Sequence, residues 1–540
     1  MKILVAEPLA AAGIDHLRAQ EGWEVIVSNP KEYAAHLSDC DALLVRSAVK
    51  VNKDLLSKAP KLRAVGRAGV GVDNVDLDAA TSAGVLVMNT PGGNAISVAE
   101  HTIGLMLSLA RAIPAASAST KSGKWEKKKF QGNELRGKTL GVMGLGSIGR
   151  EVVKRAMNFE MRIIAHDPFV NPRTATDLNV ELVSIDKLYE SSDYISLHLA
   201  LTPETHGILN ASAFAKMKPG VRIVNCARGE LIKTADLVEA MNSGIVAGAG
   251  LDVFEKEPPE ATDPILAVEN VLATPHIGGS TDEAQEIVGV RIAEQVVEYL
   301  VNGVALNAVN MPSLSPEMYK AVGPYIELAE RLGNFAAYAA TGNPTSVKLA
   351  YSGRIAELNT TLVRNAALAG VMNRSLEQRA NLVNAMPIAD ERGLSVTEQH
   401  DKPRSGRVDS VRLELETDAG VTSVEGAVIL GKPRVLVVDG IYCEATLAGH
   451  LLFLKNHDVP GVIGHVGTVL GKAGVNIANF SLGRQENVEA GKPVVAIAVV
   501  EVDGGVRRHA GHAGRGGQVE RCGLVGVDDD HVVDRVGAVG

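Results

Sequence analysis

The chain has 540 residues, of which 46% are hydrophobic and 22% are charged, and its formal net charge is −9. This length and composition indicate a soluble protein of about three or four domains, and the acidic balance argues against a nucleic-acid-binding protein. Four scattered cysteines without a CxxC pair argue against a disulfide framework and a zinc site, and no apolar run is long enough to cross a bilayer. Reduced thiols and an N-terminus that reads as a strand, not as a signal peptide, favour the cytoplasm.

The first part of the chain alternates short apolar runs with amphipathic segments. This alternation predicts the parallel strands and covering helices of a doubly wound α/β unit. The predicted strands are residues 3–6, 25–27, 42–45, 64–66 and 85–88. Residues 97–113 are apolar at helical spacing, which predicts a helix that crosses to a second unit.

A glycine-rich turn within residues 138–167 lies between a predicted strand and a predicted helix, and a second strand follows. In this GxGxxG pattern Gly144 allows a tight turn, Gly146 lets the backbone approach a pyrophosphate, and Gly149 lets the helix pack close to the strand. The second strand ends at Asp167, whose carboxylate suits a ribose diol and would repel a 2′-phosphate. This pattern predicts a dinucleotide site that prefers NAD over NADP. The alternative is an ordinary tight turn between a strand and a helix.

Three polar side chains follow later predicted strands, at Arg228, Glu257 and His276. Open α/β sheets bind ligands at the carboxyl ends of their strands. A histidine there can accept a hydroxyl proton, a carboxylate can hold its imidazole, and an arginine can pair with a substrate carboxylate. These roles suit the oxidation of a hydroxy acid. The spacing alone leaves a surface arginine, a loop acid before proline and a loop-capping histidine as alternatives.

The second unit closes with predicted strands and a helix, and a different region follows. The strands are residues 194–197, 222–225, 247–251 and 271–273, and the helix 282–301 is expected to return the chain to the first unit. After a boundary at 307–312 comes a mixed α/β region with a helix at 316–340 and an exposed polar loop at 398–405. Its expected strand pairs are 410–417 with 421–428, and 433–438 with 440–444.

The last folded unit is predicted to begin near residue 450 with a strand, a helix and two more strands. These elements are expected at 451–454, 462–473, just after 476, and 493–502. Such a βαββ start needs a second helix and a fourth strand. Residues 504–540 are instead rich in Gly, Arg, His, Asp and Val, without an amphipathic helix, which predicts a poorly ordered tail and an uncovered sheet edge. A frameshifted end is one explanation.

These motifs resemble those of the D-isomer-specific 2-hydroxyacid dehydrogenase family. The resemblance rests on the glycine turn, on segments 66–76 and 94–100, and on the residues Arg228, Glu257 and His276. It is closest to long members with an intervening domain and an ACT domain, whose signature lies at 458–461 and 474–477. It implies two doubly wound Rossmann-like subdomains, then an α+β intervening domain and a ferredoxin-like ACT regulatory domain. Glu160 departs from the pattern, since a glycine usually stands there.

The resemblance also implies an activity and a domain plan. The activity is NAD-dependent oxidation of 3-phospho-D-glycerate to 3-phosphohydroxypyruvate, the first step of L-serine biosynthesis, in a cytoplasmic homotetramer inhibited by serine. No metal, nucleic acid or membrane is implied. The expected domains are 1–96 with 280–310 for substrate, 97–279 for NAD, 311–446 as the intervening domain, 447–503 as an incomplete ACT domain, and the tail 504–540.

Site residues are carried over by the same resemblance. The catalytic residues would be Arg228, Glu257 and His276. Contacts to the cofactor would come from Gly144, Gly146, Ser147, Ile148, Gly149, Asp167, Cys226, Ala227, Arg228, Asp252, His276 and Gly279. The substrate would contact Arg46, Ser47, Arg67 and Asn94. The serine effector would contact Asp458 and Asn476.

Two other functions stay open on the sequence. One is a dehydrogenase or reductase for another 2-hydroxy acid, such as glyoxylate or hydroxypyruvate, although simpler members usually stop near residue 310. The other is a non-catalytic NAD-sensing partner protein, because relatives of this fold act as transcriptional corepressors. Replacing His276 separates an enzyme from such a partner protein.

Overall fold

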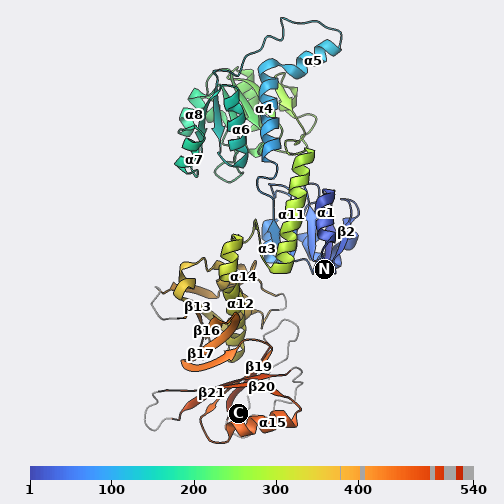
Figure 1. The fold of residues 1–540 in the computed structure, drawn as a ribbon. Coiled ribbons are helices and arrows are strands. Elements are labelled where there is room, and N and C mark those ends of the chain that lie inside the picture. The colour runs from blue at the N-terminus through green and yellow to red at the C-terminus, as the bar shows by residue number, and fades with distance from the viewer. Residues whose placement is uncertain (377–378, 402–407, 487–492, 504–518, 527–540) are drawn as a thin grey trace.

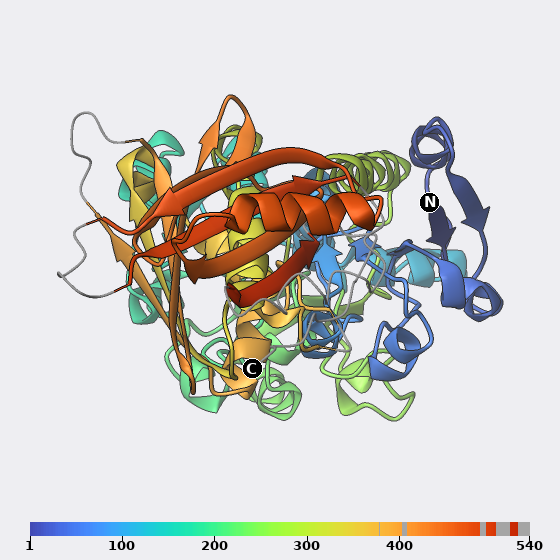
Figure 2. The same ribbon diagram turned by 90° about the horizontal axis from the view of Figure 1, so that it is seen from below.

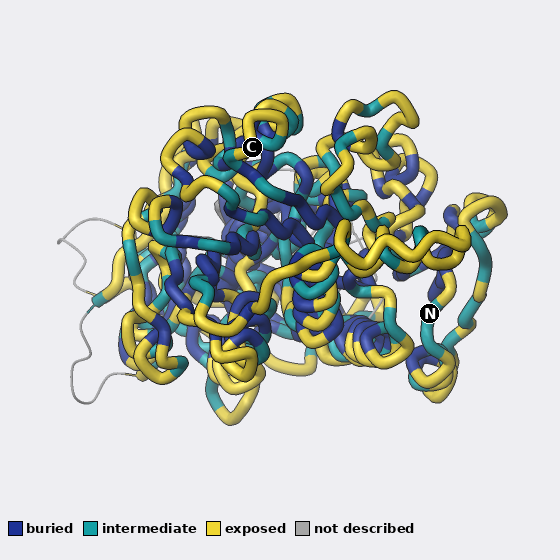
Figure 3. The backbone as a smooth tube through the Cα atoms, turned by 90° about the horizontal axis from the view of Figure 1, so that it is seen from above, coloured by how far each residue is buried: buried dark blue, intermediate teal, exposed yellow. Residues whose placement is uncertain are grey.

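The computed structural model describes residues 1–376, 379–401, 408–486, 493–503 and 519–526, the last segment by its backbone. Four sheets follow one another along an elongated molecule (Figure 1). The unit that carries α4 and α6 lies at one end, the N-terminal unit comes next, and the two C-terminal sheets complete the other end. Buried stretches gather inside these units, and exposed ones form the outer loops (Figure 3).

The first sheet has five parallel strands in the order β2-β1-β3-β4-β5. Its inner strands are almost wholly buried because helices cover both faces, and this explains their continuous apolar sequence. All five predicted strands are confirmed. The strands are β1 (Lys2–Val5), β2 (Glu24–Val27), β3 (Ala42–Val45), β4 (Ala64–Arg67) and β5 (Leu86–Met88), and the helices are α1 (Ala11–Arg18), η1 (Tyr33–Asp39), α2 (Lys53–Ser57) and α3 (Leu77–Ser82).

The second sheet has seven parallel strands in the order β12-β11-β10-β9-β6-β7-β8. The order reverses beside β6, and such a switch point is where open sheets hold ligands. Its strands are β6 (Thr139–Met143), β7 (Arg162–His166), β8 (Glu181–Leu182), β9 (Tyr194–Leu197), β10 (Val221–Asn225), β11 (Val246–Leu251) and β12 (Val271–Ala273). Its helices are α4 (Ala95–Arg111), α5 (Ile113–Lys121), α6 (Ser147–Asn158), α7 (Pro172–Asp177), α8 (Ile185–Ser191), α9 (Ala211–Phe214), η2 (Gly229–Leu231), α10 (Thr234–Asn242) and η3 (Pro264–Ala267).

The long helix α11 (Asp282–Asn302) returns from the second sheet to the first (Figure 1). Thr281 caps its start, because its side chain accepts a hydrogen bond from the Ala284 N–H, and Gly303 ends it at φ 73°. Close packing on α1 depends on glycine, since a Cβ on Gly13 would collide with the carbonyl oxygen of Gly289. The helix thus ties the two units together.

The third sheet is mixed, in the order β14-β13-β15-β16-β17-β18, with β13 and β14 parallel and the other pairs antiparallel. Helices α12 and α13 pack closely together, and α12 lies on the sheet. The strands are β13 (Pro344–Ser352), β14 (Ser395–His400), β15 (Ser410–Thr417), β16 (Gly420–Ile429), β17 (Lys432–Val438) and β18 (Ile441–Thr446), and the helices are α12 (Pro316–Ala339), η4 (Gly353–Glu357), α13 (Thr361–Met372) and α14 (Ala385–Glu391).

The expected loop at 398–405 is wrong over its first three residues. Residues 398–400 belong to β14, which supplies the backbone partners of the outer side of β13. The strand was missed because it is polar and mostly exposed, as edge strands often are. A buried tyrosine also holds it, since the Tyr351 hydroxyl donates to Glu398 Oε1 at 2.9 Å. Residues 402–405 lie outside the described residues.

The fourth sheet is antiparallel in the order β20-β21-β19-β22, with α15 on its outer face (Figure 2). Its elements are β19 (His450–His457), α15 (Val462–Lys472), β20 (Ile477–Arg484), β21 (Val495–Val502) and β22 (Val519–Gly526). The other face packs against the unit that contains the third sheet. There the ring of Phe335 in α12 and the ring of Phe453 in β19 meet edge to face, with centroids 5.4 Å apart.

The expectation that no fourth strand follows residue 503 is wrong. Strand β22 pairs with β19 and completes the 4-1-3-2 strand order of a ferredoxin-like sheet. Without β22, the buried central strand β19 would have one unpaired edge. The other parts of the predicted tail, 504–518 and 527–540, lie outside the described residues.

Among the described helices, none is by itself long and apolar enough to span a membrane. The bent pair α4 and α5 meets the length and composition limits only when the two helices are taken together. Much of α4 is buried against the second sheet, where it contacts β10 and β11.

Candidate active site

The glycine turn opens α6 with the geometry that a dinucleotide needs. Gly144 has φ 95°, and a Cβ there would lie 2.5 Å from the carbonyl oxygen of His198. A Cβ on Gly149 would collide with the carbonyl oxygen of Gly144. Beside Gly146 nothing lies within 4 Å of an added Cβ, and this residue caps α6 without a side-chain hydrogen bond. Open space therefore faces uncapped N–H groups at a helix start, which suits a phosphate.

Asp167 holds this turn against the end of β7. Its Oδ2 accepts the Leu145 N–H at 2.8 Å, and its Oδ1 accepts the N–H groups of Phe169 at 2.9 Å and Val170 at 3.1 Å. The side chain stays partly exposed, and Oδ2, which accepts one of these hydrogen bonds, has capacity for a further donor. Ser147 and Ile148 form the first turn of α6 beside it.

His276 and Glu257 form an ion pair at the ends of the second sheet. Nδ1 of His276 lies 2.7 Å from Glu257 Oε2, and Glu257 Oε1 accepts the Phe254 N–H at 3.1 Å. The hydrogen bond to Glu257 raises the pKa of His276 above its ordinary value, against the effect of burial. Burial favours a higher pKa for Glu257, but His276, the Phe254 N–H and Arg228 together outweigh it, and the pKa of this carboxyl falls below its usual range. The pair therefore stabilises the protonated imidazole of His276 and the ionised carboxylate of Glu257.

The loop that carries His276 is held by Asp252. His276 has φ 53°, an uncommon conformation for a side chain other than glycine. Asp252 is 1% exposed, and its carboxylate accepts the N–H groups of Ile277 at 2.9 Å and Gly278 at 2.8 Å, and the Thr274 hydroxyl at 2.6 Å. The structure thus uses Asp252 to position the His276 loop, a role that sequence reasoning missed. Its expected contact with the cofactor stays a prediction.

Arg228 reaches from the second unit into the first. Its Nε and Nη2 donate to the two carboxylate oxygens of Asp73, at 3.1 and 2.8 Å, and its Nη1 donates to the Ala227 carbonyl oxygen at 2.6 Å. Asn225 shapes the loop below, since it accepts the Ala227 N–H and donates to the Arg228 carbonyl oxygen. Cys226 is 9% exposed, and burial raises the pKa of its thiol to about 12.

Two further arginines lie near this pair. Burial lowers the pKa of Arg67, and the positive charges of Arg228 and Arg46 act in the same direction. The backbone N–H of Arg46 donates to Glu7 Oε1 at 2.8 Å, and the exposed Ser47 follows in the same turn. Glu7 also accepts two more backbone N–H groups of this turn. Sequence reasoning missed Glu7, although an acid directly after a buried strand was a usable signal.

Asn94 and Gly279 meet where the two units join. A Cβ on Gly279 would lie 2.7 Å from Asn94 Nδ2, so glycine is needed for this approach. Asn94 Oδ1 is buried and accepts no hydrogen bond from the part of the chain that the structure describes. Nearby, the Ser97 and Thr281 hydroxyls are 2.7 Å apart and join α4 to the start of α11.

The two expected effector residues both lie in the unit that contains the fourth sheet. Asp458 Oδ2 is 3.1 Å from Arg484 Nε, and Asn476 Nδ2 donates to Asp503 Oδ2 at 2.6 Å. Each side chain therefore has a polar partner within its own sheet unit. Among the described residues, no group of three or more His, Cys, Asp or Glu side chains is arranged to hold a metal ion.

Comparisons with known proteins agree with this geometry. Three family descriptions match: the D-isomer specific 2-hydroxyacid dehydrogenase NAD binding domain at 103–278, the D-3-phosphoglycerate dehydrogenase intervening domain at 321–439, and the ACT domain at 450–506. The chain is 42% identical to D-3-phosphoglycerate dehydrogenase of Archaeoglobus fulgidus, over 92% of this chain and 95% of the relative. Its identity to the enzyme of that name from Methanocaldococcus jannaschii is 44%, over 90% and 93%.

A solved structure matches more than half of the chain. NAD-bound 3-phosphoglycerate dehydrogenase of Entamoeba histolytica is 31% identical, with a TM-score of 0.50, over 58% of this chain and 99% of that one. The matched NAD binding domain, 103–278, includes the glycine turn and the residues Arg228, Glu257 and His276.

Proposed function

The chain belongs to the D-3-phosphoglycerate dehydrogenases of the D-isomer specific 2-hydroxyacid dehydrogenase family, and we propose that it oxidises 3-phospho-D-glycerate to 3-phosphohydroxypyruvate with NAD. This reaction begins L-serine biosynthesis. The observation that carries the proposal is the His276–Glu257 ion pair beside a cluster of arginines. The ion pair supplies a base for the substrate hydroxyl, and the arginines supply a binding site for an anionic acid.

We assign the base to Nε2 of His276. Because Nδ1 faces the Glu257 carboxylate, Nδ1 carries the ring proton and Nε2 keeps its lone pair for the substrate hydroxyl. NAD, when bound, accepts the hydride from the carbon that bears this hydroxyl. The proton then rests on His276, and Glu257 stabilises the imidazolium that forms. The reverse reaction returns this proton to the carbonyl oxygen.

The arginines suit a substrate with two anionic groups. We assign Arg228 to the substrate carboxylate and to the carbonyl that forms, because a guanidinium binds a carboxylate with two parallel hydrogen bonds. Arg46 and Arg67 then face the phosphate, with Ser47 and Asn94 as polar neighbours. The pKa of Arg67 is already lowered by burial and by Arg228, so an anion that enters relieves repulsion among these side chains.

The residues at the glycine turn fit NAD. Gly146 offers open space at the start of α6, where N–H groups can meet a pyrophosphate, and we assign Asp167, at the end of β7, to a ribose diol. The remaining contacts are assigned to the first turn of α6, to the loops after β10 and β11, and to the His276 loop. These are Ser147, Ile148, Cys226, Ala227, Asp252 and Gly279.

The test is NADH formation from 3-phospho-D-glycerate and NAD, with and without serine. Turnover that serine suppresses supports the substrate and a regulatory ACT domain in which Asp458 and Asn476 contact the effector. Turnover blind to serine supports the substrate and contradicts that regulation. NAD binding without turnover contradicts the substrate, and glyoxylate and hydroxypyruvate with NADH then test the other 2-hydroxy acids.

Replacing Glu257 by glutamine is expected to shift the pH dependence of oxidation. Glu257 raises the pKa of His276, so its loss lowers this pKa. Oxidation needs neutral imidazole, which is present above the pKa, and the acidic limb of kcat/KM therefore moves to lower pH. The plateau also falls, since the imidazolium loses its partner. Steady-state rates across pH measure both effects, with Glu260→Gln, an exposed acid near this loop, as the control. A limb that stays in place contradicts the assignment.

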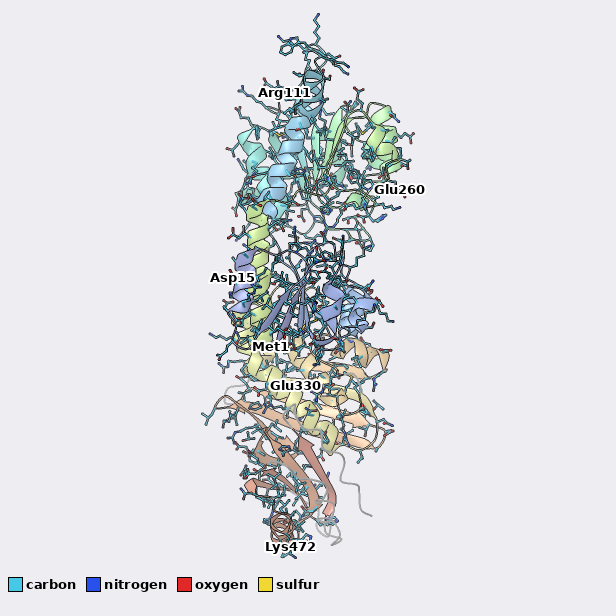
Figure 4. The ribbon with its side chains drawn as sticks, turned by 90° about the vertical axis from the view of Figure 1, so that its right-hand side faces the viewer. Met1, Asp15, Arg111, Glu260, Glu330 and Lys472 are labelled. Carbon is cyan, nitrogen blue, oxygen red and sulfur yellow. The ribbon has the colours of Figure 1, made fainter. Side chains whose placement is uncertain are left out.

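We also propose a cytoplasmic homo-oligomer, a tetramer on the family resemblance, in which a second copy covers α5. Helix α5 has no buried residue, and Ile113 and the nearby Trp125 are 50% and 85% exposed. The helix projects beyond the end of α4, which Arg111 marks (Figures 1 and 4). An apolar arm of this kind is typical of an interaction surface.

The double variant Ile113→Ser, Trp125→Ser is expected to lower the mass measured by light scattering, because it removes apolar area that the second copy would bury. Leu430 is 93% exposed at the turn between β16 and β17 and provides the control Leu430→Ser, which should leave the mass unchanged. A double variant with the wild-type mass would contradict a role of α5 in assembly.

A further inference from the structure

An acid of the first unit, Asp73, holds the guanidinium of Arg228 from the second unit. The two residues are 155 positions apart and come from different sheets. Both hydrogen bonds are made on one side of the guanidinium, by Nε at 3.1 Å and by Nη2 at 2.8 Å. Asp73 is thus a two-point support for the arginine assigned to the substrate carboxylate.

The count of donors shows what remains for a substrate. A guanidinium has five N–H groups. Asp73 takes two of them, and the carbonyl oxygen of Ala227 takes a third from Nη1 at 2.6 Å. One N–H remains on each of Nη1 and Nη2. These two belong to the end of the guanidinium farthest from its side-chain stem, so an anion can dock there while Asp73 keeps its place.

The glycine-rich loop is shaped around this pair. A Cβ on Gly71 would collide with Nη2 of Arg228 and lie 2.7 Å from Asp73 Oδ2, so a larger residue there would displace this pair. Burial favours a higher pKa for Asp73, but Arg228, a backbone hydrogen bond and Arg67 together outweigh it and the pKa falls, which keeps the carboxylate charged. Arg67 lies close enough to repel Arg228. Without the negative charge of Asp73, the two guanidinium groups would move apart.

We propose that Asp73 is a positioning residue that fixes Arg228 across the two units, so that the free end of the guanidinium meets the substrate carboxylate. This inference rests on the proposed function. Asp73 acts chiefly through Arg228, with a weaker charge interaction with Arg67, and touches neither substrate nor NAD. Arg228, which receives the substrate, thus comes from the second unit, and Asp73, which orients Arg228, comes from the first.

A double-mutant cycle with Asp73→Asn and Arg228→Ala tests the coupling. Asparagine keeps the shape but removes the charge, and we expect kcat/KM to fall by about 10²-fold, the usual effect of a misplaced contact, with unchanged NAD affinity. Because Asp73 acts through Arg228, the double variant should be no worse than Arg228→Ala. Asp73→Glu, which keeps the charge, should recover part of the loss. The matched control is Asp76→Asn in the same loop, where Asp76 caps α3 and asparagine caps equally well.

If the losses of kcat/KM in the two single variants add up in the double variant, the inference is overturned. An Asp73→Asn variant with wild-type kcat/KM would overturn it as well. A lower KM for this variant would also overturn it, since Asp73 would then compete with the substrate for Arg228. Oxalate binding to the NADH complex separates this outcome from a wrong substrate. If the wild type ignores 3-phospho-D-glycerate but binds oxalate about tenfold more tightly than Asp73→Asn does, the function fails and the inference stands. Equal oxalate binding, or none in the wild type, overturns the inference.

Discussion

Replacing His276 by alanine is expected to lower the turnover of 3-phospho-D-glycerate by about 10²–10⁴-fold, the usual contribution of a general base. No other imidazole in the described part of the chain is paired with Glu257. The loss should appear mainly in kcat, because the hydroxyl proton moves in the transition state. NAD affinity should be nearly unchanged, since the glycine turn and Asp167 stay in place.

Turnover by NADH absorbance and NAD affinity by calorimetry measure the two halves of this prediction. The control is His206→Ala, an exposed histidine of the same unit. Retained turnover in the His276 variant would contradict the mechanism. Loss of NAD binding together with turnover would mean that the left-handed loop around His276, with φ 53°, collapses without the imidazole. An NAD-sensing partner protein would keep its function without His276.

Local sequence predicted the parallel sheets well, for a physical reason. A strand buried on both faces must be a continuous apolar run, and such runs stand out between amphipathic helices. All five strands of the first sheet and the main strands of the second were found in this way. Strands β14 and β22 were missed because partners distant in sequence, β13 and β19, supply their hydrogen bonds. Their own sequences are polar or glycine-rich and carry no such pattern.

The residues of the site also differ in how readily local sequence reveals them. The glycine turn could be found because three glycines stand at fixed spacing, two of them, Gly144 and Gly149, for steric reasons within the turn. The support of Arg228 by Asp73 could not, because it joins residues 155 positions apart. The departure at Glu160 was visible from the family pattern, and the structure places this residue at φ 57°, where glycine is the usual choice. The sequence thus showed the groups that do chemistry more readily than the groups that aim them.

Two glycine-to-alanine changes in the same turn are expected to weaken NAD binding for different reasons, one by lowering stability and one without changing it. In Gly149→Ala, the new Cβ collides with the backbone carbonyl oxygen of Gly144, and neither backbone can move without separating α6 from β6. Overpacking of this kind costs about 1–3 kcal/mol of stability, so the melting temperature should fall, and NAD binding with it. In Gly146→Ala, nothing lies within 4 Å of the new Cβ, and φ −66° suits alanine.

Gly146→Ala should therefore fold as the wild type does and lose NAD affinity by about tenfold or more, because its methyl group enters the space assigned to the pyrophosphate. Thermal unfolding without ligand and titration with NAD distinguish the two variants. The matched control is Gly104→Ala on α4, where an added Cβ also meets nothing within 4 Å. If Gly146→Ala binds NAD normally, the pyrophosphate does not pass over this turn. If Gly149→Ala unfolds at the wild-type temperature, close packing of α6 is not what the third glycine provides.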